Sequence, residues 1–532
     1  MPCYDWGSEE STVFRRLLLF CFLFIIFSAP AFGATYIDLQ DTHVYSALSR
    51  LEALGIIRSG LLDTKPLSRK EVFRLLHEAE ANPSAADPFI SRLLASLKDH
   101  LGKDPSEGTE LRPLDSAYLK YAYTSAIVDA LRYNTAIENE QPLNANNDGD
   151  LYKRGSNERL GFVSRLEDWG PLSIEINPEW RYPRASYTGY PDTAYETKEF
   201  VARKAYAVLS AGKWDLIVGK DSQWWGPGYD GALLLSNNAE PLTMIKVTNA
   251  EPVRLPWILD VMGPSRFTFF LTKLDRTRPV PEPYLFGMRF DFKPSPYVEF
   301  SLERTAIVGG EGRPTTFKTW IQSITGQSHG GQTDYFSPNY VNIDDERAGA
   351  DLKVTIPWRL QPMQIYLEAA GEDESSRLPV PQDWAFVGGL YLPRILDAER
   401  FDFRLEYTTT RGRINAPYVW YTHNIYDSYT YEGNIIGHHI GTDADQFLAE
   451  ISYLIPERSG RVYLRLNREE HNLHAPGSQE SLHEMTVGGR ISVTSALEVS
   501  AAFSYGLLRN PGNIAASAIN VDLIETGMKY RF

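Results

Sequence analysis

The chain has 532 residues and a formal net charge of −15 at neutral pH. Such an acidic protein is a poor candidate for binding nucleic acid, because phosphate groups attract Lys and Arg and repel Asp and Glu. Beyond residue 33 no stretch approaches the ~18 consecutive apolar residues that favour a membrane-spanning helix, which argues against a helical membrane protein.

The first 33 residues have the order of a secretory signal peptide. Arg15 and Arg16 precede an apolar run over residues 17–27, and small residues such as Ala31 and Gly33 follow. A membrane anchor is the alternative, but the run is shorter than the ~18 residues that a spanning helix requires. The pattern therefore predicts cleavage near residue 33 and export from the cytoplasm.

Both cysteines, Cys3 and Cys21, lie inside this predicted signal. We therefore expect a mature chain without thiols, disulfides or metal sites that use Cys, although export brings it to a compartment where disulfides form.

Residues 34–114 are predicted to form a periplasmic helical segment. Apolar residues recur at helical spacing over residues 44–54, and Gly55 stops this first helix. Ser68 and Glu71 then have the spacing of a capping box, in which a Ser side chain and a Glu side chain satisfy free N–H groups at a helix start. Two short amphipathic helices are expected here.

A third helix is predicted to begin at Asp87 and Pro88 and to continue to residue 101, because Pro is favoured at a first helical position. The phrase L-E-A-L-G-I-I-R-S-G-L-L, with L-S-R-K-E-V-F-R-L-L after it, also resembles one S-layer-homology repeat. In some outer-membrane proteins such repeats grip the cell wall. A plain helical bundle and a cell-wall contact therefore both stay open for this segment.

After Pro113 the pattern changes to a period of two, which predicts strands with one apolar and one polar face. We expect about 18 antiparallel strands that close into a transmembrane barrel over residues 115–532. The 30 Tyr, 25 Phe and 11 Trp are enough for the aromatic girdles of such a barrel. The predicted strands lie near residues 118–134, 160–167, 172–182, 200–209, 214–220, 242–248, 266–274, 284–292, 297–304, 349–356, 363–370, 384–392, 401–409, 447–455, 462–469, 485–493, 497–505 and 521–532.

The connections between these segments alternate between short and long. Outer-membrane barrels have short periplasmic turns and long external loops, so this alternation supports a barrel over a soluble β-sandwich. Counting back from the last strand places residues 221–241 on the outside. The connection at residues 249–265 is long for a periplasmic turn, and the sequence offers no reason for it.

The predicted external loop at residues 221–241 is rich in aromatic and hydrogen-bonding side chains. It contains Trp224, Trp225, Tyr229 and Asp230. Sugars present apolar C–H faces and a fringe of hydroxyl groups, which such side chains can contact together. These residues are candidates for polysaccharide binding. Trp at the membrane surface, or Trp that packs the loop into the barrel, is the alternative.

A second aromatic loop follows near residues 418–446. Tyr418, Trp420 and Tyr421 are further candidates for sugar stacking, and His438 and His439 are candidates for polar contacts. Adjacent histidines in a strand point to opposite sides, so we expect no shared metal ion and no cofactor. The sequence also has no G-x-S-x-G, H-E-x-x-H or phosphate-binding loop, and it is not expected to be an enzyme.

The final strand, residues 521–532, alternates apolar and polar side chains and ends on Phe532. A terminal strand that closes with Tyr-x-Phe resembles the strand that outer-membrane barrels present to their assembly machinery. That machinery and outer-membrane lipid are therefore expected partners.

Several blocks together resemble the Wzi-type capsule assembly proteins over essentially the whole mature chain. The most specific are G-K-D-S-Q-W-W-G-P-G-Y-D-G-A-L-L-L-S-N-N-A-E-P and G-N-I-I-G-H-H-I-G-T-D-A-D-Q. The resemblance implies a barrel in the cell outer membrane with a periplasmic helical bundle. It also implies lectin-like, non-catalytic attachment of capsular or extracellular polysaccharide. An outer-membrane porin or sugar-selective channel is the main alternative, and a barrel hydrolase is a weaker one.

Overall fold

A computed structural model describes residues 33–126, 128–133, 135–183, 200–326, 343–374, 381–412, 420–474 and 477–532. The predicted signal peptide, except for its last residue, and the predicted site residue Tyr418 lie outside these ranges. No helix within the described ranges is both long and apolar enough to cross a membrane.

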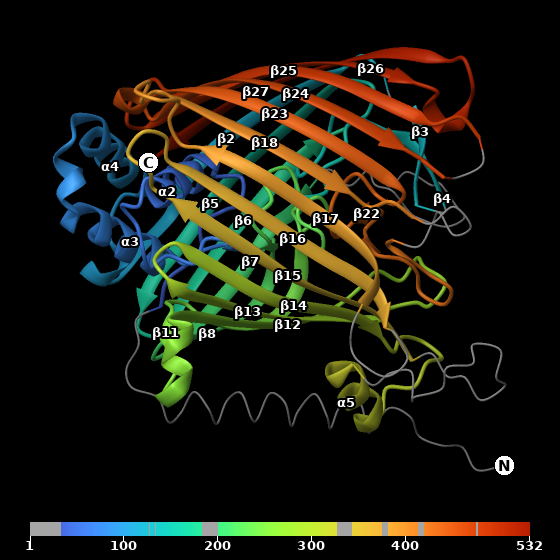
Figure 1. The fold of residues 1–532 in the computed structure, drawn as a ribbon, viewed down its shortest axis with the longest axis horizontal. Coiled ribbons are helices and arrows are strands. Elements are labelled where there is room, and N and C mark those ends of the chain that lie inside the picture. The colour runs from blue at the N-terminus through green and yellow to red at the C-terminus, as the bar shows by residue number, and fades with distance from the viewer. Residues whose placement is uncertain are drawn as a thin grey trace.

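Eighteen long antiparallel strands in the described residues form a closed barrel, as the alternating pattern predicts (Figure 1). Each strand pairs with its neighbours in chain order, and β27 pairs with β2 to close the wall. The strands are β2 (Glu110–Thr124), β5 (Gly155–Trp169), β6 (Leu172–Tyr182), β7 (Phe200–Ala211), β8 (Trp214–Asp221), β10 (Leu242–Asn249), β12 (Pro264–Lys273), β13 (Tyr284–Ser295), β14 (Val298–Val308), β15 (Asp344–Ile356), β16 (Met363–Glu374), β17 (Pro381–Leu392), β18 (Phe401–Thr409), β23 (Ala444–Ile455), β24 (Gly460–His471), β25 (Glu480–Ser492), β26 (Leu497–Arg509) and β27 (Ala518–Arg531).

The first predicted strand differs from the observed one. The wall begins at Glu110, before the boundary predicted at residue 115, and β2 ends at Thr124. The end of the predicted strand instead forms a separate hairpin, β3 (Val128–Tyr133) with β4 (Thr135–Glu140). The chain bends at Ser125, so an alternating pattern continues in sequence but not in one strand.

The wall has an apolar outside and a charged inside. On β14, Leu302 points outward and is 46% exposed, whereas Ser301 and Glu303 beside it are buried in the lumen. Arg289 on β13 forms ion pairs with Asp291 (2.8 Å), Asp351 (2.7 Å) and Glu303, and all four side chains are fully buried. This alternation is what a barrel in lipid requires, because only the outer face meets hydrocarbon.

The three predicted N-terminal helices form, and the second and third begin where the capping pattern predicts. They are α2 (Thr42–Ala53), α3 (Arg69–Ala81) and α4 (Pro88–Leu101). The Ser68 hydroxyl accepts a hydrogen bond from the Glu71 N–H (3.1 Å), and Asp87 caps α4 in the same way. The Glu71 carboxylate pairs with Arg74 instead of returning to the Ser68 N–H, so only one half of the capping box forms.

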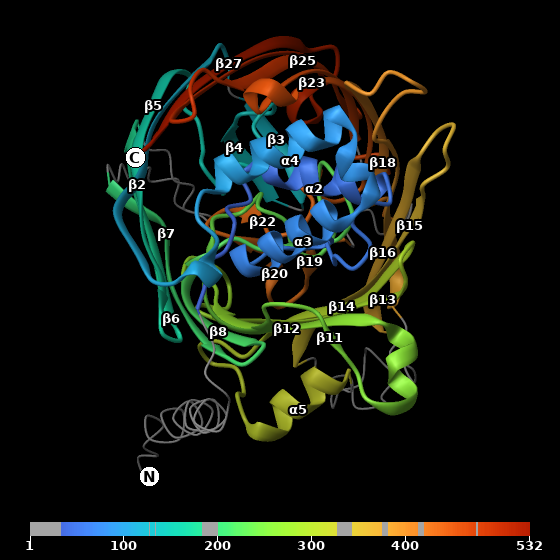
Figure 2. The same ribbon diagram turned by 90° about the vertical axis from the view of Figure 1, so that its left-hand side faces the viewer.

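These helices cover the end of the barrel at which the chain ends (Figures 1 and 2). Their apolar faces share one core, and the neighbouring segments enter the lumen. Thr64 donates to Asp291 of the wall (2.7 Å), and Tyr36 donates to Asp215 (2.8 Å). We call residues 33–109 the helical plug, because they fill this end of the barrel. Short helical turns η1 (Pro83–Ala86) and η2 (Pro105–Glu107) complete it.

Connections at the plugged end are short and those at the other end are long, as predicted. The exception at residues 249–265 contains β11 (Val253–Arg254) and the helical turn η3 (Trp257–Met262). Trp257 and Ile258 there are 94% and 85% exposed. The extra length of this connection, for which the sequence offered no reason, thus forms a short helical turn with exposed apolar side chains.

At the opposite end, α5 (Phe317–Thr325) lies outside the wall (Figure 2). Its Trp320 ring packs edge-on against Tyr284 at 5.6 Å. The remaining short elements are β1 (Thr64–Lys65), β9 (Trp224–Trp225), β19 (Thr422–His423), β20 (Asp427–Ser428), β21 (Thr430–Tyr431), β22 (Asn434–Ile435), η4 (Pro456–Arg458) and η5 (Pro511–Asn513).

Candidate functional site

A cavity of about 320 Å³ lies in the barrel lumen between the helical plug and the loop at residues 221–241. Plug residues such as Tyr45 and Lys65 form one side, and loop residues Trp224, Tyr229 and Asp230 form another. Inward-facing wall residues complete it. A volume of this size is at the lower end of the ~300–1,000 Å³ range of small-molecule sites. The predicted residues Trp224, Tyr229, Asp230 and His439 all line it.

The loop at residues 221–241 folds into the barrel and pairs with the plug. Trp224 and Trp225 form β9, which pairs with β1 of the plug, with Thr64 opposite Trp225. The Trp225 ring contacts Phe270 edge-on at 5.4 Å and is completely buried. The loop is therefore held by backbone pairing on one side and by apolar packing on the other.

The second aromatic loop packs on the first. The rings of Tyr421 and Tyr429 are stacked at 5.8 Å with an angle of 8° between their planes. Their hydroxyl groups donate to the backbone carbonyls of Leu233 (2.7 Å) and Leu234 (3.0 Å) in the first loop. We call Trp225, Trp420, Tyr421, Tyr426 and Tyr429 the aromatic seal, because all belong to one buried cluster.

Burial limits what three of the predicted residues can do. Trp225, Trp420 and Tyr421 are between 0% and 2% exposed, so their rings have no free face for a polymer outside the cell in this conformation. They have the packing role that the sequence left open as the alternative for a tryptophan-rich loop. A loop that packs into the lumen and a loop that binds sugar outside the barrel both need aromatic and hydrogen-bonding residues. The local sequence therefore does not distinguish the two roles.

The two histidines do not diverge as expected for a strand. His438 and His439 lie in a turn, and their rings stack at 4.7 Å. Burial, together with the charge of His439, holds the pKa of His438 well below its usual value. Burial would also lower the pKa of His439, but its hydrogen bond to Glu469 and the charge of Asp230 raise it. Within the described ranges, no group of His, Cys, Asp and Glu side chains could hold a metal ion.

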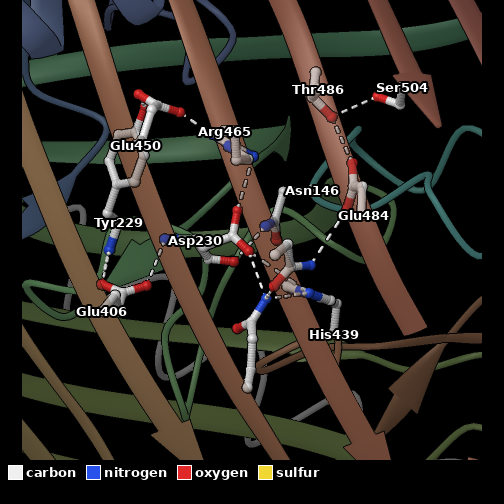
Figure 3. Close-up of polar contacts among 12 residues, drawn as sticks. Asn146, Tyr229, Asp230, Glu406, His439, Glu450, Arg465, Glu484, Thr486 and Ser504 are labelled. Carbon is white, nitrogen blue, oxygen red and sulfur yellow. Dashed lines mark hydrogen bonds and ion pairs between the residues drawn. The ribbon is translucent and has the colours of Figure 1, made fainter. Parts of the chain in front are cut away.

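Tyr229 and Asp230 join the loop to the wall through a polar network (Figure 3). Their backbone N–H groups donate to the two oxygens of Glu406, at 2.6 and 2.9 Å. The Tyr229 hydroxyl donates to Glu450 (2.7 Å), and Arg465 bridges Glu450 (2.9 Å) and Asp230 (3.1 Å). The main chain of the loop is thus fixed beside the cavity by charge-assisted hydrogen bonds, which are the stronger class.

Other cavity residues were not singled out from the sequence. Lys65 belongs to a segment predicted to lie in a separate helical bundle, and Arg404 is one inward position among many on the strands. A charged residue at an inward position of a predicted strand could have identified Arg404 as a lumen residue. The sequence holds no such indication for Lys65. Only the path of residues 56–68 through the lumen brings the two together.

Comparisons with known proteins point to one family. Residues 133–513 match the family described as capsule assembly protein Wzi. An uncharacterised 55.8 kDa protein in the cps region of Klebsiella pneumoniae is 26% identical over 396 residues, which cover 73% of this chain and 68% of that protein. Among solved structures, Escherichia coli Wzi has a TM-score of 0.68 and 21% identity, covering 94% of this chain and 99% of that one. It is described as a carbohydrate-binding outer-membrane β-barrel involved in group 1 capsule assembly. OccAB2 of Acinetobacter baumannii has a TM-score of 0.45 and 11% identity, covering 78% of this chain and 98% of that one.

Proposed function

The chain belongs to the family of capsule assembly protein Wzi, and from this premise we propose that it attaches exported capsular or other extracellular polysaccharide to the cell surface. The protein is an outer-membrane β-barrel, and its action is attachment without catalysis. The structurally similar E. coli Wzi is described as carbohydrate-binding, which supports the same class of ligand for this chain.

The observation that carries this proposal over a porin is the content of the lumen. A porin needs a water-filled passage, whereas here residues 33–109 occupy one end of the barrel and the aromatic seal occupies the other. Loops that pack inward and bond to one another favour a barrel that presents a surface over one that conducts. Trp224, Tyr229 and Asp230 at the cavity remain the candidate sugar contacts from the sequence.

Deletion of the gene in the native host tests the proposal. We expect cells that export a normal total amount of polysaccharide but release more of it into the medium and keep less on the surface. Complementation with the wild-type gene should restore surface retention. An unchanged ratio of bound to released polymer would contradict the proposal, and a loss of small-solute uptake with normal retention would favour the porin.

The last residue provides a test of the expected interaction with the barrel assembly machinery. Phe532 is 62% exposed and its ring contacts only Tyr530 among the described aromatic rings, so it contributes little packing to the folded wall. We predict that deleting Phe532 lowers the yield in the outer membrane much more than it lowers the thermal stability of inserted protein. Western blots of outer-membrane fractions and heat-modifiable gel mobility measure the two quantities. Normal yield of the truncated chain would show that this residue is incidental.

A contact between the helical segment and the cell wall is also a proposal. The apolar faces of α3 and α4 are buried in the plug. Such a contact would therefore use their outward faces, which carry exposed residues such as His77 and Asp99.

A further inference from the structure

Two cations face the lumen cavity without an acidic partner. Among the described residues, none forms a hydrogen bond or ion pair with the Lys65 ammonium, which lies 5.2 Å from the centre of the Trp224 ring and 5.7 Å from that of Tyr45. These ring contacts leave the N–H donors of Lys65 available to the cavity. Burial is the main reason why the pKa of Lys65 is lowered to about 8, and the charges of Lys353 and Arg404 lower it further against the effects of Asp63 and Glu406.

Arg404 on β18 is the second cation. Its guanidinium group lies between two rings, 3.7 Å from the centre of Tyr391 and 4.4 Å from that of Tyr229. The side chain is 8% exposed, and within the described part of the chain it has no hydrogen bond or ion pair; its Nε is fully buried without a partner. The rings occupy the two faces of the guanidinium and leave its N–H edge free to meet an anion.

The carboxylates around the same cavity are all engaged. Glu52 and Asp63 pair with Lys353 at 3.0 and 2.6 Å, and Asp230 pairs with Arg465 at 3.1 Å. The two others are Glu469, which pairs with His439 and His471, and Glu484, which accepts from Thr486 and Asn467. The cavity therefore has acidic groups with partners and two cations without one. Buried charges are normally paired, because an unpaired charge loses its hydration without compensation.

We propose that this cavity binds a sugar unit that carries a carboxylate or a phosphate group, with Lys65 and Arg404 holding the anion. An arginine edge matches the two oxygens of such a group, and a lysine adds a point charge beside it. Trp224 and Leu62 supply apolar wall in the same cavity. The volume of about 320 Å³ suits a chain end or a short fragment rather than the length of a polymer.

The identity of the sugar source rests on the proposed function, but binding of the anion does not. A polysaccharide that contains acidic units supplies such a chain end, and a free phosphate group shares the same anionic chemistry. The acidity of the whole protein makes two unpaired cations in one cavity distinctive, since a net charge of −15 disfavours anion binding elsewhere.

The test is calorimetry on the full mature chain in detergent, with glucuronate, glucose and inorganic phosphate as probes. We expect glucuronate to bind the wild type about tenfold or more tightly than glucose, since one hydrogen bond to a charged group changes an equilibrium by about that factor. We expect phosphate to bind more weakly than glucuronate. Equal binding of phosphate would leave a plain anion site and overturn the sugar part of the proposal.

Variants assign the binding to the two cations. The double variant K65Q/R404Q should bind glucuronate no better than glucose, whereas K318Q/R359Q, which changes two exposed residues outside the cavity, should bind like the wild type. K65R keeps the positive charge and should retain binding, which separates loss of charge from loss of folding. Unchanged glucuronate binding in K65Q/R404Q would overturn the proposal.

These results are independent of the cell experiment above. If deletion leaves surface polysaccharide unchanged while the purified wild type binds glucuronate, the proposed function fails and the anion site stands. If deletion releases polymer while the purified wild type fails to bind glucuronate, the anion site fails and the proposed function stands.

Discussion

The two ends of the lumen are filled by different physical means. The helical plug is fixed to the wall mainly by ion pairs, such as those of Lys353 on β15 with Glu52 (3.0 Å) and Asp63 (2.6 Å). The aromatic seal is fixed mainly by apolar packing and by hydroxyl bonds from Tyr421 and Tyr429 to backbone carbonyls.

This difference determines how each end should respond to solution conditions. A buried ion pair is costly to break on one side, because the remaining charge stays buried without a partner. Packed aromatic rings are insensitive to pH but sensitive to truncation, because the space left behind is not refilled. The stability of the plugged end should therefore depend on pH, and the stability of the other end should depend on the volume of its aromatic side chains.

The two ends of the barrel should also differ in the side of the membrane that they face. We place single cysteines in the two connections that flank β26, at Ser495 on the plugged side and at Ala515 on the side of the seal. Both positions are exposed, and the predicted mature chain has no other thiol. We expect a membrane-impermeant maleimide to label A515C on intact cells and S495C only after the outer membrane is permeabilised.

The opposite labelling would invert the topology and put the helical plug on the cell surface. Ser428 is unsuitable for this purpose, although it lies in the predicted external loop, because it is buried in the structure.

Truncation of the aromatic seal should have the next largest effect. We predict that W225A/Y421A opens the outer end of the lumen, because each buried aromatic changed to Ala costs roughly 3–5 kcal/mol of packing. Planar-bilayer recordings should show a conductance above that of the wild type. The matched control W384A/F386A removes two outward-facing rings, about 40% exposed, and should not change conductance. Equal conductance of the seal variant and this control would mean that other residues close the lumen.

Removal of one cation should loosen the plugged end instead. K353M leaves Glu52, Asp63 and Glu299 without this partner, and breaking one side of a buried pair typically costs ~3–5 kcal/mol. We expect faster hydrogen exchange in α2 while the wall strands keep their protection. K213M, at an exposed turn position, is the control. Loss of protection in the wall as well would show that the plug and the barrel unfold together.

Acid should act on the same end by a smaller amount. Burial alone would raise the pKa of Glu52, but Lys293 and Lys353 hold it down at about 2. A depressed carboxyl pKa adds stability above the unfolded value of ~4.3, and this stability is lost as the pH falls towards 2. The contribution of Glu52 to this loss between pH 6 and 3 should be on the order of 2 kcal/mol, and it is partly offset by Asp63, whose pKa burial raises.

Protection factors for α2 and for residues 420–435 measure this at pH 6 and 3, after correction for intrinsic exchange. Only α2 should lose protection, because the hydroxyl groups of Tyr421 and Tyr429, whose pKa values burial raises, stay protonated throughout. A parallel loss in both regions would remove the distinction between the two ends.

The wall was predictable because its rule is local. Alternation of side chains is visible within each strand, and after the first strand the strand centres fall where the pattern predicts. The caps of α3 and α4 were also predictable, since Ser68 and Asp87 act on residues two or three positions away.

The site was less predictable, because it depends on whether each loop folds into the lumen or extends away from the barrel. Trp225 is buried by Phe270 on another strand, and Lys65 and Arg404 line the same cavity although they lie hundreds of residues apart in the chain. Nothing in the local sequence of a Gly-rich loop indicates whether it turns inward or outward. The stacked His438 and His439 rings follow from a turn that the strand-based argument did not contain.

Two short helical elements lie beside the same sector of the barrel wall, one near each end. η3 contacts β13 at the plugged end, and α5 contacts β14 at the other end, so two short helices lie beside the same sector of the wall (Figures 1 and 2). Each exposes apolar residues, among them Val261 (71%) and Phe317 (74%). Exposed apolar side chains of this kind favour the boundary between headgroups and acyl chains. We expect the two elements to resist vertical displacement and tilt of the barrel on this flank more than on the opposite flank. In a crowded membrane, neighbouring proteins and lipids would therefore contact two different flanks of the barrel, one with these apolar elements and one without them.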